Sequence, residues 1–262
     1  MDDICSYFNN SLADPVLLNN IHFNQFLYAD DLVLISETPS GLQQCVDAIQ
    51  SFCSEWSLTV NTNKTKTMII SNNKNRYCID RLCFYFGPNQ LESCTEYIYL
   101  GVIFNNKGKL NNSAENLSEK ERKAYFSLKS KIPYSNFISV EKWIKLFDSL
   151  ITPIMTYGSE IWISEFKINF NVIDKLLLEK IKNMIFKIIL GVHSKASNLA
   201  IQTELGYYLI CIKSYKLMFK YYFRLVDTES NCDSKLNLLR AAFIEDKNLY
   251  NNKYPSWVQT VF

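Results

Sequence analysis

Several features that mark other protein classes are missing from this sequence. None of its eight cysteines forms a C-x-x-C pair, and His22 and His193 are its only histidines, so a structural zinc site has no support. No uncharged apolar run approaches the roughly 18–20 residues that a membrane-spanning helix needs. The first residues are acidic and polar, which does not fit a secretory signal.

The composition is that of a folded protein. Of the 262 residues, 48% are hydrophobic and 14% aromatic, which is enough to build a core and excludes a wholly disordered chain. The length allows one large domain or two small ones. Without a secretory signal, the cysteines indicate reduced, partly buried thiols in an intracellular protein.

The formal net charge of +2 conceals an asymmetry. Residues 1–110 carry 7 Lys and Arg against 11 Asp and Glu, whereas residues 111–262 carry 21 against 15. The second part is therefore the better candidate for contact with a polyanion, although exposed lysines also serve solubility.

The first part indicates β-structure with one inserted helix. Two short apolar runs, 22–28 and 32–36, flank Ala29-Asp30-Asp31, which predicts two strands joined by a tight acidic turn. Thr38 is a suitable N-cap, and the apolar spacing from Leu42 to Trp56 predicts an amphipathic helix.

Further strands are expected over 67–71, over 83–86 and 90–94 as a hairpin around Gly87-Pro88-Asn89, and over 97–104 as one strand containing Gly101. The predicted fold class is α+β, with a small antiparallel sheet and its packed helix followed by a helical region.

The second part is predicted to be helical. Periodic segments lie near 116–131, 139–151, 172–190 and 207–226, and Pro153 with Gly158 should interrupt or end the second. The expected domains are 1–110, 111–226, and a tail over 227–262 that has no firm assignment.

The adjacent carboxylates of Asp30 and Asp31 are the most informative chemical feature. Two like charges on a rigid turn repel unless a cation lies between them or both are solvated. Mg²⁺ is bound by one or two carboxylates and fills its shell with water and phosphate oxygens, so such a turn can hold a metal that acts on phosphates. The alternative is a plain solvated surface turn.

Five ordered segments together resemble one family. Phe26–Ser36 contains Tyr28-Ala29-Asp30-Asp31, which resembles the YxDD motif of reverse transcriptases, in the form found in non-LTR (LINE-type) retrotransposons. The similarity continues through the following helix, through Trp56–Met68 ("W-x-L-x-V-N-x-x-K-T-K-x-M"), Tyr99–Val102 ("YLG"), Pro153–Trp162 ("P-x-x-x-Y-G-x-E-x-W"), and Leu190-Gly191-Val192 with Glu204-Leu205-Gly206. It covers roughly residues 1–226.

The resemblance implies a partial polymerase palm followed by a thumb-like region, and RNA-directed DNA synthesis by two-metal phosphoryl transfer. Asp30 would be a direct ligand of Mg²⁺, with Mn²⁺ as the alternative ion, and Asp31 would assist it. The implied partners of the full-length parent are an RNA template, a DNA primer and deoxynucleoside triphosphates, with no membrane.

Other roles follow from the same resemblance. Tyr28 and Ala29 would lie by the primer end, and Lys64, with Lys66 as second choice, would stand near the leaving pyrophosphate. Tyr99, Leu100 and Gly101 would help to form a primer-gripping strand. The basic segment 119–145, with Lys120, Arg122 and Lys123, would contact the duplex backbone. The plain alternatives are exposed lysines and a core strand with a glycine kink.

Two motifs of the family are missing. A further metal-binding aspartate and a glycine-glutamine segment should precede the YxDD turn, but only 29 residues precede Asp30, and their carboxylates are Asp2, Asp3 and Asp14. We therefore expect an N-terminally truncated polymerase with negligible activity alone. A non-catalytic nucleic-acid-binding module that uses the basic helical half, and a chain that does not fold stably, are the alternatives. The oligomeric state and the choice between nucleus and cytoplasm stay open.

Overall fold

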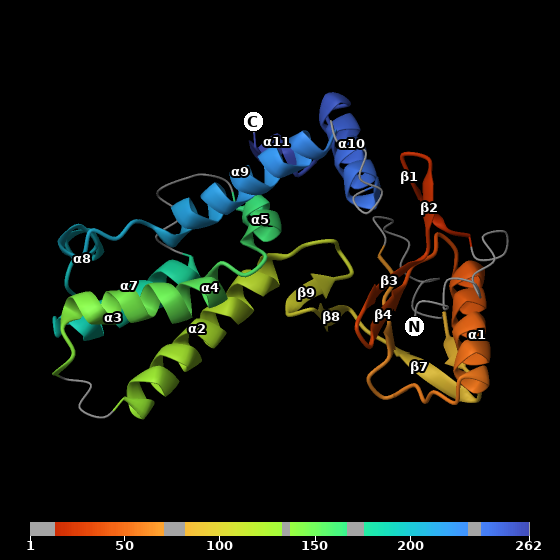
Figure 1. Ribbon diagram of the computed structural model, residues 1–262, viewed down its shortest axis with the longest axis horizontal. Helices are drawn as coiled ribbons and strands as arrows, with labels where there is room; N and C mark the ends of the chain where they lie inside the picture. The colour runs from red at the N-terminus through yellow and green to blue at the C-terminus, as the bar shows by residue number, and fades with distance from the viewer. Residues whose placement is uncertain (1–13, 71–81, 133–136, 167–175, 230–236, 262) are drawn as a thin grey trace. The chain divides into compact units, whose positions relative to one another are not determined.

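The computed structural model describes residues 14–70, 82–132, 137–166, 176–229 and 237–261 (Figure 1). The chain divides into two compact units. The first contains residues 1–98, 105–108 and 231–254, and the second contains residues 99–104, 109–230 and 255–262. The domain boundaries expected near 110 and 226 stay predictions.

The first unit begins with two antiparallel hairpins. Strand β1 (Val16–Leu18) pairs with β2 (Ile21–Phe23), and β3 (Gln25–Tyr28) pairs with β4 (Asp31–Leu34). In the second hairpin Tyr28 lies opposite Asp31, so Ala29 and Asp30 alone form the turn. The predicted hairpin around the acidic turn is thereby confirmed.

Helix α1 (Pro39–Glu55) confirms the predicted amphipathic helix. The Thr38 hydroxyl accepts a hydrogen bond from the Gly41 amide at 3.1 Å and caps the N-terminus. The buried side chains of the helix pack against strand residues in two small clusters, one with Leu32 and Leu34 and one with Phe84 and Leu91.

A three-stranded sheet lies beside α1, in the order β5 (Lys66–Thr67), β7 (Asn89–Ser93), β6 (Phe84–Phe86). The β6–β7 hairpin was predicted. The helix also satisfies polar groups of β6 and its turn. Gln43 exchanges two hydrogen bonds with the Tyr85 backbone, at 2.8 and 2.9 Å, and Gln50 accepts from the Gly87 amide at 2.8 Å. Such pairing occupies polar groups that an edge strand would otherwise expose.

Four details of the predicted β-structure are wrong. The strand expected over 67–71 is short, because β5 ends at Thr67 and residues 68–70 form no strand. The strands that the structure describes form four separate small sheets instead of one, and β5 runs parallel to β7. Residues 97–104 are not one strand but a hairpin of β8 (Glu96–Tyr99) and β9 (Val102–Asn105). Leu100 and Gly101 both have positive φ, 47° and 81°, and these angles turn the chain instead of extending it.

The expected tail contains further helices. Helix α10 (Asn237–Asn251) belongs to the first unit and packs against β1, where Glu245 accepts a hydrogen bond from the Asn19 amide at 3.1 Å. Helix α11 (Val258–Val261) belongs to the second unit and packs against α9 (Ile210–Glu229).

The second unit is a set of packed helices. Helix α2 (Asn111–Lys131) packs against α7 (Leu177–Leu190) and α4 (Thr152–Met155), while α5 (Ser159–Trp162) packs against α9 (Figure 1). The other helical elements that the structure describes in this unit are α3 (Val140–Leu146), the π-helix η4 (Phe147–Ile151), the 3₁₀-helix η5 (Ile163–Glu165) and α8 (Asn198–Glu204).

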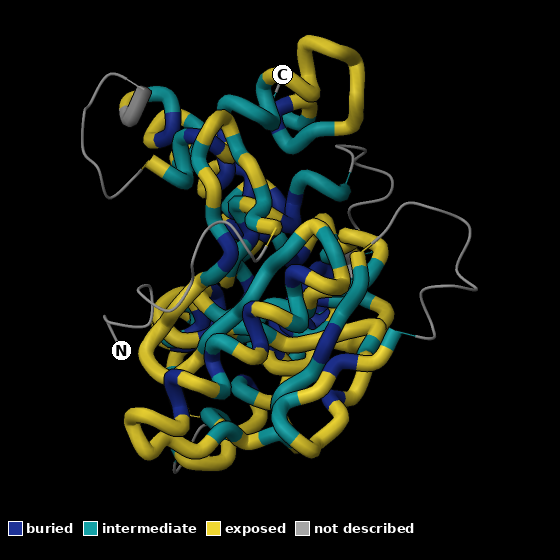
Figure 2. The backbone as a smooth tube through the Cα atoms, turned by 90° about the vertical axis from the view of Figure 1, so that its right-hand side faces the viewer, coloured by how far each residue is buried: buried dark blue, intermediate teal, exposed yellow. Residues whose placement is uncertain are grey.

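The core of this unit is rich in large side chains. Phe147, Met155, Trp162, Ile185 and Phe186 are almost completely buried, and Figure 2 marks the buried positions along the backbone. Burial of a large aromatic or aliphatic side chain is worth about 1.5–3 kcal/mol, so this cluster is the main source of stability of the unit. No helix in the described ranges is long and apolar enough to cross a membrane.

The predicted helices near 116–131, 139–151 and 207–226 are confirmed. The segment predicted over 172–190 is helical from Leu177, and residues 172–175 lie outside the described ranges. The expected interruption also occurs. Pro153 has no N–H to give to the carbonyl four residues earlier, and the helix widens into a π-helix just before it. Gly158, at φ 63°, precedes α5.

Candidate functional site

The carboxylate turn is an exposed hairpin tip. Asp30 occupies the second turn position and Asp31 begins β4, and both side chains are exposed. Neither carboxylate forms a hydrogen bond or an ion pair with another residue that the structure describes. The pair is therefore solvated and accessible to a cation or a phosphate-bearing ligand.

Ala29 holds an unusual backbone conformation at this turn. Its φ of 54° lies in the left-handed region, which residues other than glycine, asparagine and aspartate adopt at a cost of about 1 kcal/mol or more. The neighbouring Tyr28 is 63% exposed. The turn thus presents a large aromatic ring and two carboxylates within four consecutive residues.

The two candidate lysines have different surroundings. Lys64 ends a turn in which its amide donates to the Asn61 carbonyl at 3.1 Å and to Asn61 Oδ1 at 3.2 Å, and its side chain is exposed. Lys66 lies on β5, opposite Glu92 of β7, and its ammonium contacts that carboxylate at 2.5 Å. Lys64 is therefore the freer cation of the two.

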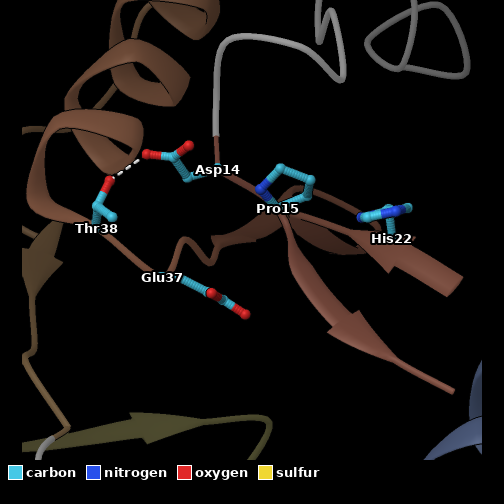
Figure 3. A pocket seen from close by; sticks show the side chains of 5 residues that line it. All are labelled: Asp14, Pro15, His22, Glu37 and Thr38. Carbon is cyan, nitrogen blue, oxygen red and sulfur yellow. Dashed lines mark hydrogen bonds between the residues drawn. The ribbon is translucent and has the colours of Figure 1, made fainter. Parts of the chain in front are cut away.

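The upstream carboxylates do not join the turn. Asp14 accepts a hydrogen bond from the Thr38 hydroxyl at the N-terminus of α1, in a pocket that Pro15, His22 and Glu37 also line (Figure 3). Asp2 and Asp3 lie outside the described residues. Among the residues that the structure describes, no group of three or more His, Cys, Asp and Glu side chains is placed to hold a metal ion.

The hairpin turn of the "YLG" segment contacts the "P-x-x-x-Y-G-x-E-x-W" segment. The Tyr157 hydroxyl donates to the Leu100 carbonyl at 2.7 Å, and a Cβ on Gly101 would lie only 3.3 Å from the Tyr157 ring. Trp162, which is buried, donates in turn to the Tyr157 carbonyl at 2.8 Å. The two segments are far apart in sequence, so their likeness to the same family gave no hint of this contact.

Ser113 is a second anchor of the same hairpin that the sequence did not reveal. Its hydroxyl accepts from the Ile103 amide at 3.0 Å and donates to the Ile103 carbonyl at 3.1 Å. The sequence signal for such a role is weak: it is a serine near the start of a predicted helix. Tyr99, Leu100 and Gly101 are therefore placed at a turn that α2 and the 152–162 region hold.

The basic residues on α2 are exposed as expected for a charged helix face. Lys120 and Lys123 project from exposed positions, whereas the Arg122 guanidinium pairs with Glu119 at 3.1 Å. Glu121 differs from its neighbours because it is fully buried. Two of the three predicted cations are thus without an ion-pair partner among the described residues.

Removal of the Tyr157 hydroxyl should loosen the hairpin turn. We expect Tyr157→Phe to lower the free energy of unfolding by about 0.5–1.5 kcal/mol and to speed amide exchange at Gly101 and Val102, because the bond to the Leu100 carbonyl is lost. Hydrogen exchange measured by NMR over residues 96–105 tests this. Tyr85→Phe is the matched control, since Tyr85 is also exposed and its hydroxyl bonds no described residue. Equal exchange in the two variants would contradict the prediction.

Comparison with known proteins finds similarity to reverse transcriptases and to proteins of transposable elements. Residues 3–104 match the family model described as reverse transcriptase (RNA-dependent DNA polymerase). A Caenorhabditis elegans protein described as transposon-derived is 31% identical over 149 residues, which cover 55% of this chain and 50% of that protein.

A second relative is the retrovirus-related Pol polyprotein from the type-2 retrotransposable element R2DM of Drosophila melanogaster. It is 33% identical over 109 residues, which cover 39% of this chain and 10% of the polyprotein. The chain thus matches half the length of the first relative and a tenth of the second. No solved structure matches.

Proposed function

We propose that this chain is the palm and thumb-like part of an RNA-directed DNA polymerase of a non-LTR retrotransposon. The observation that carries the proposal is the exposed hairpin turn with Asp30 at its tip and Asp31 beside it, within the segment that matches the reverse transcriptase family. The similarity to a polyprotein of a type-2 retrotransposable element supports the non-LTR class.

Asp30 and Asp31 have the donor chemistry that Mg²⁺ or Mn²⁺ requires. Both are exposed, oxygen-donating and unpaired with other described residues, and two carboxylates leave most of an octahedral shell to water and phosphate oxygens. An ion bound there would supply neutralisation of phosphate charge and activation of the primer 3′-hydroxyl.

The neighbouring residues have proposed roles in binding. The exposed Tyr28 ring would stack near the primer end, and the small Ala29 would allow close approach of the backbone. Lys64 would offset charge on the leaving pyrophosphate, while Lys66 is engaged with Glu92.

The hairpin turn and α2 would contact the nucleic acid away from the reacting atoms. Tyr99, Leu100 and Gly101 would support the primer from a turn. On α2, Lys120 and Lys123 would meet duplex phosphates and add affinity without sequence preference. Arg122 would do so only after release from Glu119.

We propose further that the 262-residue polypeptide does not extend primers by itself. Two-metal transfer requires more carboxylate ligands than the turn provides, and Asp14 is bound at the α1 cap. Catalysis would then need carboxylates from another segment. Without them the chain would act as a nucleic-acid-binding module through its basic helical half.

The metal-binding part of the proposal can be tested without activity. Substoichiometric Mn²⁺ should broaden the amide NMR signals of residues 29–32 in the wild type but not in Asp30→Asn/Asp31→Asn, because the paramagnetic ion then loses both ligands. Asp47→Asn/Glu55→Gln is the matched control, which removes two exposed carboxylates of α1. Broadening that persists in the turn variant, or that is equally strong at α1, would refute the assignment.

Primer extension on an RNA template tests the proposal that the chain does not extend primers by itself. We expect no extension by the wild type above the level of Asp30→Ala/Asp31→Ala, and salt-dependent binding of the primer–template that survives both substitutions. Metal-dependent extension that these substitutions abolish would support the polymerase and overturn the claim of inactivity. Absence of any binding would overturn the binding-module role.

A further inference from the structure

Helix α9 has one face that the packing of its unit leaves open. On the inner side Tyr215, Met218 and Leu225 are buried in the core. On the outer side Phe219 and Phe223, one helical turn apart, are 38% and 61% exposed. Residues four apart lie on the same side of a helix, so Phe219 and Phe223 form an aromatic edge along α9. Figure 1 shows the course of this helix. Exposed phenylalanines in a row are uncommon unless something binds them.

A row of cations runs beside the aromatic edge. Lys216, Lys220 and Arg224 are exposed and also four residues apart, which places them about 6 Å apart along the helix axis. None forms an ion pair with a residue that the structure describes, whereas Lys213 of the same helix pairs with Asp148 at 2.6 Å. No acidic residue occurs anywhere in 205–226.

The sequence of unpaired charges decides what this face can attract. Exposed cations on a helix are normally accompanied by acidic residues three or four positions away, which neutralise them and stabilise the helix. In α9 Lys216 and Lys220 have no acidic residue three or four positions away, whereas Arg224 has Asp227 three positions after it. Lys216 and Lys220 therefore give this face a positive potential beside the two aromatic rings, and the complementary ligand is an anion that also carries flat apolar groups.

We propose that this face of α9, defined by Lys216, Phe219, Lys220, Phe223 and Arg224, binds single-stranded nucleic acid. The three cations contact successive phosphates, and the two rings stack with unpaired bases, which is the combination that single-strand binding surfaces use. A duplex hides its base faces and would leave the rings unused. The proposal rests on the nucleic-acid-binding role proposed above for the basic helical half, and it is independent of the carboxylate turn, because neither metal nor primer end takes part.

Binding of a fluorescent single-stranded oligonucleotide, followed by anisotropy in EDTA, tests the proposal. Lys216→Gln/Lys220→Gln/Arg224→Gln should weaken binding by about tenfold or more and reduce the slope of log K against log salt concentration by about 2, since each phosphate contact contributes about 0.7 on a single strand. Lys107→Gln/Lys109→Gln/Lys180→Gln removes the same charge from other exposed positions and should leave the slope nearly unchanged.

The aromatic part needs its own pair of variants. Phe219→Ala/Phe223→Ala should weaken binding by about fivefold or more for each ring while the salt slope stays the same. Phe219→Tyr/Phe223→Tyr, which keeps the rings, should bind like the wild type. All five side chains concerned are exposed or partly exposed, so thermal unfolding measured by circular dichroism should confirm that each variant folds.

Three outcomes would overturn the proposal. The first is equal weakening by the two triple-charge variants, which would mean non-specific attraction. The second is retention of affinity by Phe219→Ala/Phe223→Ala. The third is stronger binding to vesicles of phosphatidylserine and phosphatidylcholine than to the oligonucleotide, lost in the same phenylalanine variant, which would assign the face to a membrane surface. The results of the Mn²⁺ and primer-extension measurements at the carboxylate turn would bear on the proposed polymerase and not on this face.

Discussion

Replacement of Lys182 by methionine, with Glu179 left in place, should lower the free energy of unfolding by about 3–5 kcal/mol. Both side chains are fully buried on α7 and form an ion pair. Glu179 also accepts from the Cys211 amide at 3.3 Å, near the start of α9, and Lys182 donates to the Tyr208 carbonyl at 3.4 Å. Loss of the ammonium would leave the carboxylate charged, buried and without its counter-ion.

A double-mutant cycle separates the ion pair from the packing. Urea unfolding of Lys182→Met, Glu179→Leu and the double variant should show the double variant to be less destabilised than the sum of the singles, because no charge is then stranded. Lys145→Met is the control, since Lys145 pairs with Glu141 at 2.8 Å on the surface, where water screens the charges and the pair adds little stability. Additive effects within about 0.5 kcal/mol would contradict the coupling.

Replacement of Glu121 by methionine should stabilise the protein at pH 8, by an amount on the order of 2–4 kcal/mol. Glu121 is fully buried on α2, and neither of its carboxylate oxygens has a hydrogen-bond partner among the residues that the structure describes. Burial raises the pKa of Glu121 to about 9, an effect that Glu179 increases and Lys182 opposes. The folded protein therefore holds this side chain protonated at neutral pH, and methionine fits the same space without a polar group.

The pH dependence follows from the direction of this shift. The pKa is higher in the folded state than the ordinary 4.5, so the contribution of Glu121 to stability is fully present below pH 4.5 and is lost as the pH rises to about 9. The loss is up to about 1.4 kcal/mol per pH unit. Urea unfolding at pH 5 to 9 should show a falling free energy in the wild type and a flatter profile in Glu121→Met. Glu119→Met, on the exposed side of the same helix, should keep the wild-type slope. Parallel profiles for the wild type and Glu121→Met would refute the prediction.

Local signals in the sequence were sufficient for α1 and for the acidic hairpin. Thr38 and the periodic apolar residues define the helix without help from other segments. The turn at Leu100 and Gly101 could not be found in this way, because leucine is a rare residue at positive φ and the flanking apolar run looks like one strand. The parallel pairing of β5 with β7 joins segments more than 20 residues apart, which no local pattern specifies.

In the candidate site, too, local features could be predicted from the sequence, and contacts between distant segments could not. The sequence located the turn of Asp30 and Asp31, because two carboxylates at the tip of an apolar hairpin are chemically distinctive. It gave no account of the pairing of Lys66 with Glu92, which depends on strand register. The burial of Glu121 has a signal in the sequence. Four-residue spacing places Glu121 on the same helix face as Leu117 and Tyr125, which are both buried.

The anchoring of the β8–β9 turn has a consequence for how this protein can be divided. The match to the reverse transcriptase family model ends at residue 104, within β9. The Leu100 carbonyl and the Ile103 amide find their partners later in the chain, in Tyr157 and Ser113. A polypeptide cut at residue 104 would retain every residue of the family match and lose both anchors. The end of the match to the family model and the end of the segment that holds this hairpin in place therefore fall at different positions in this chain.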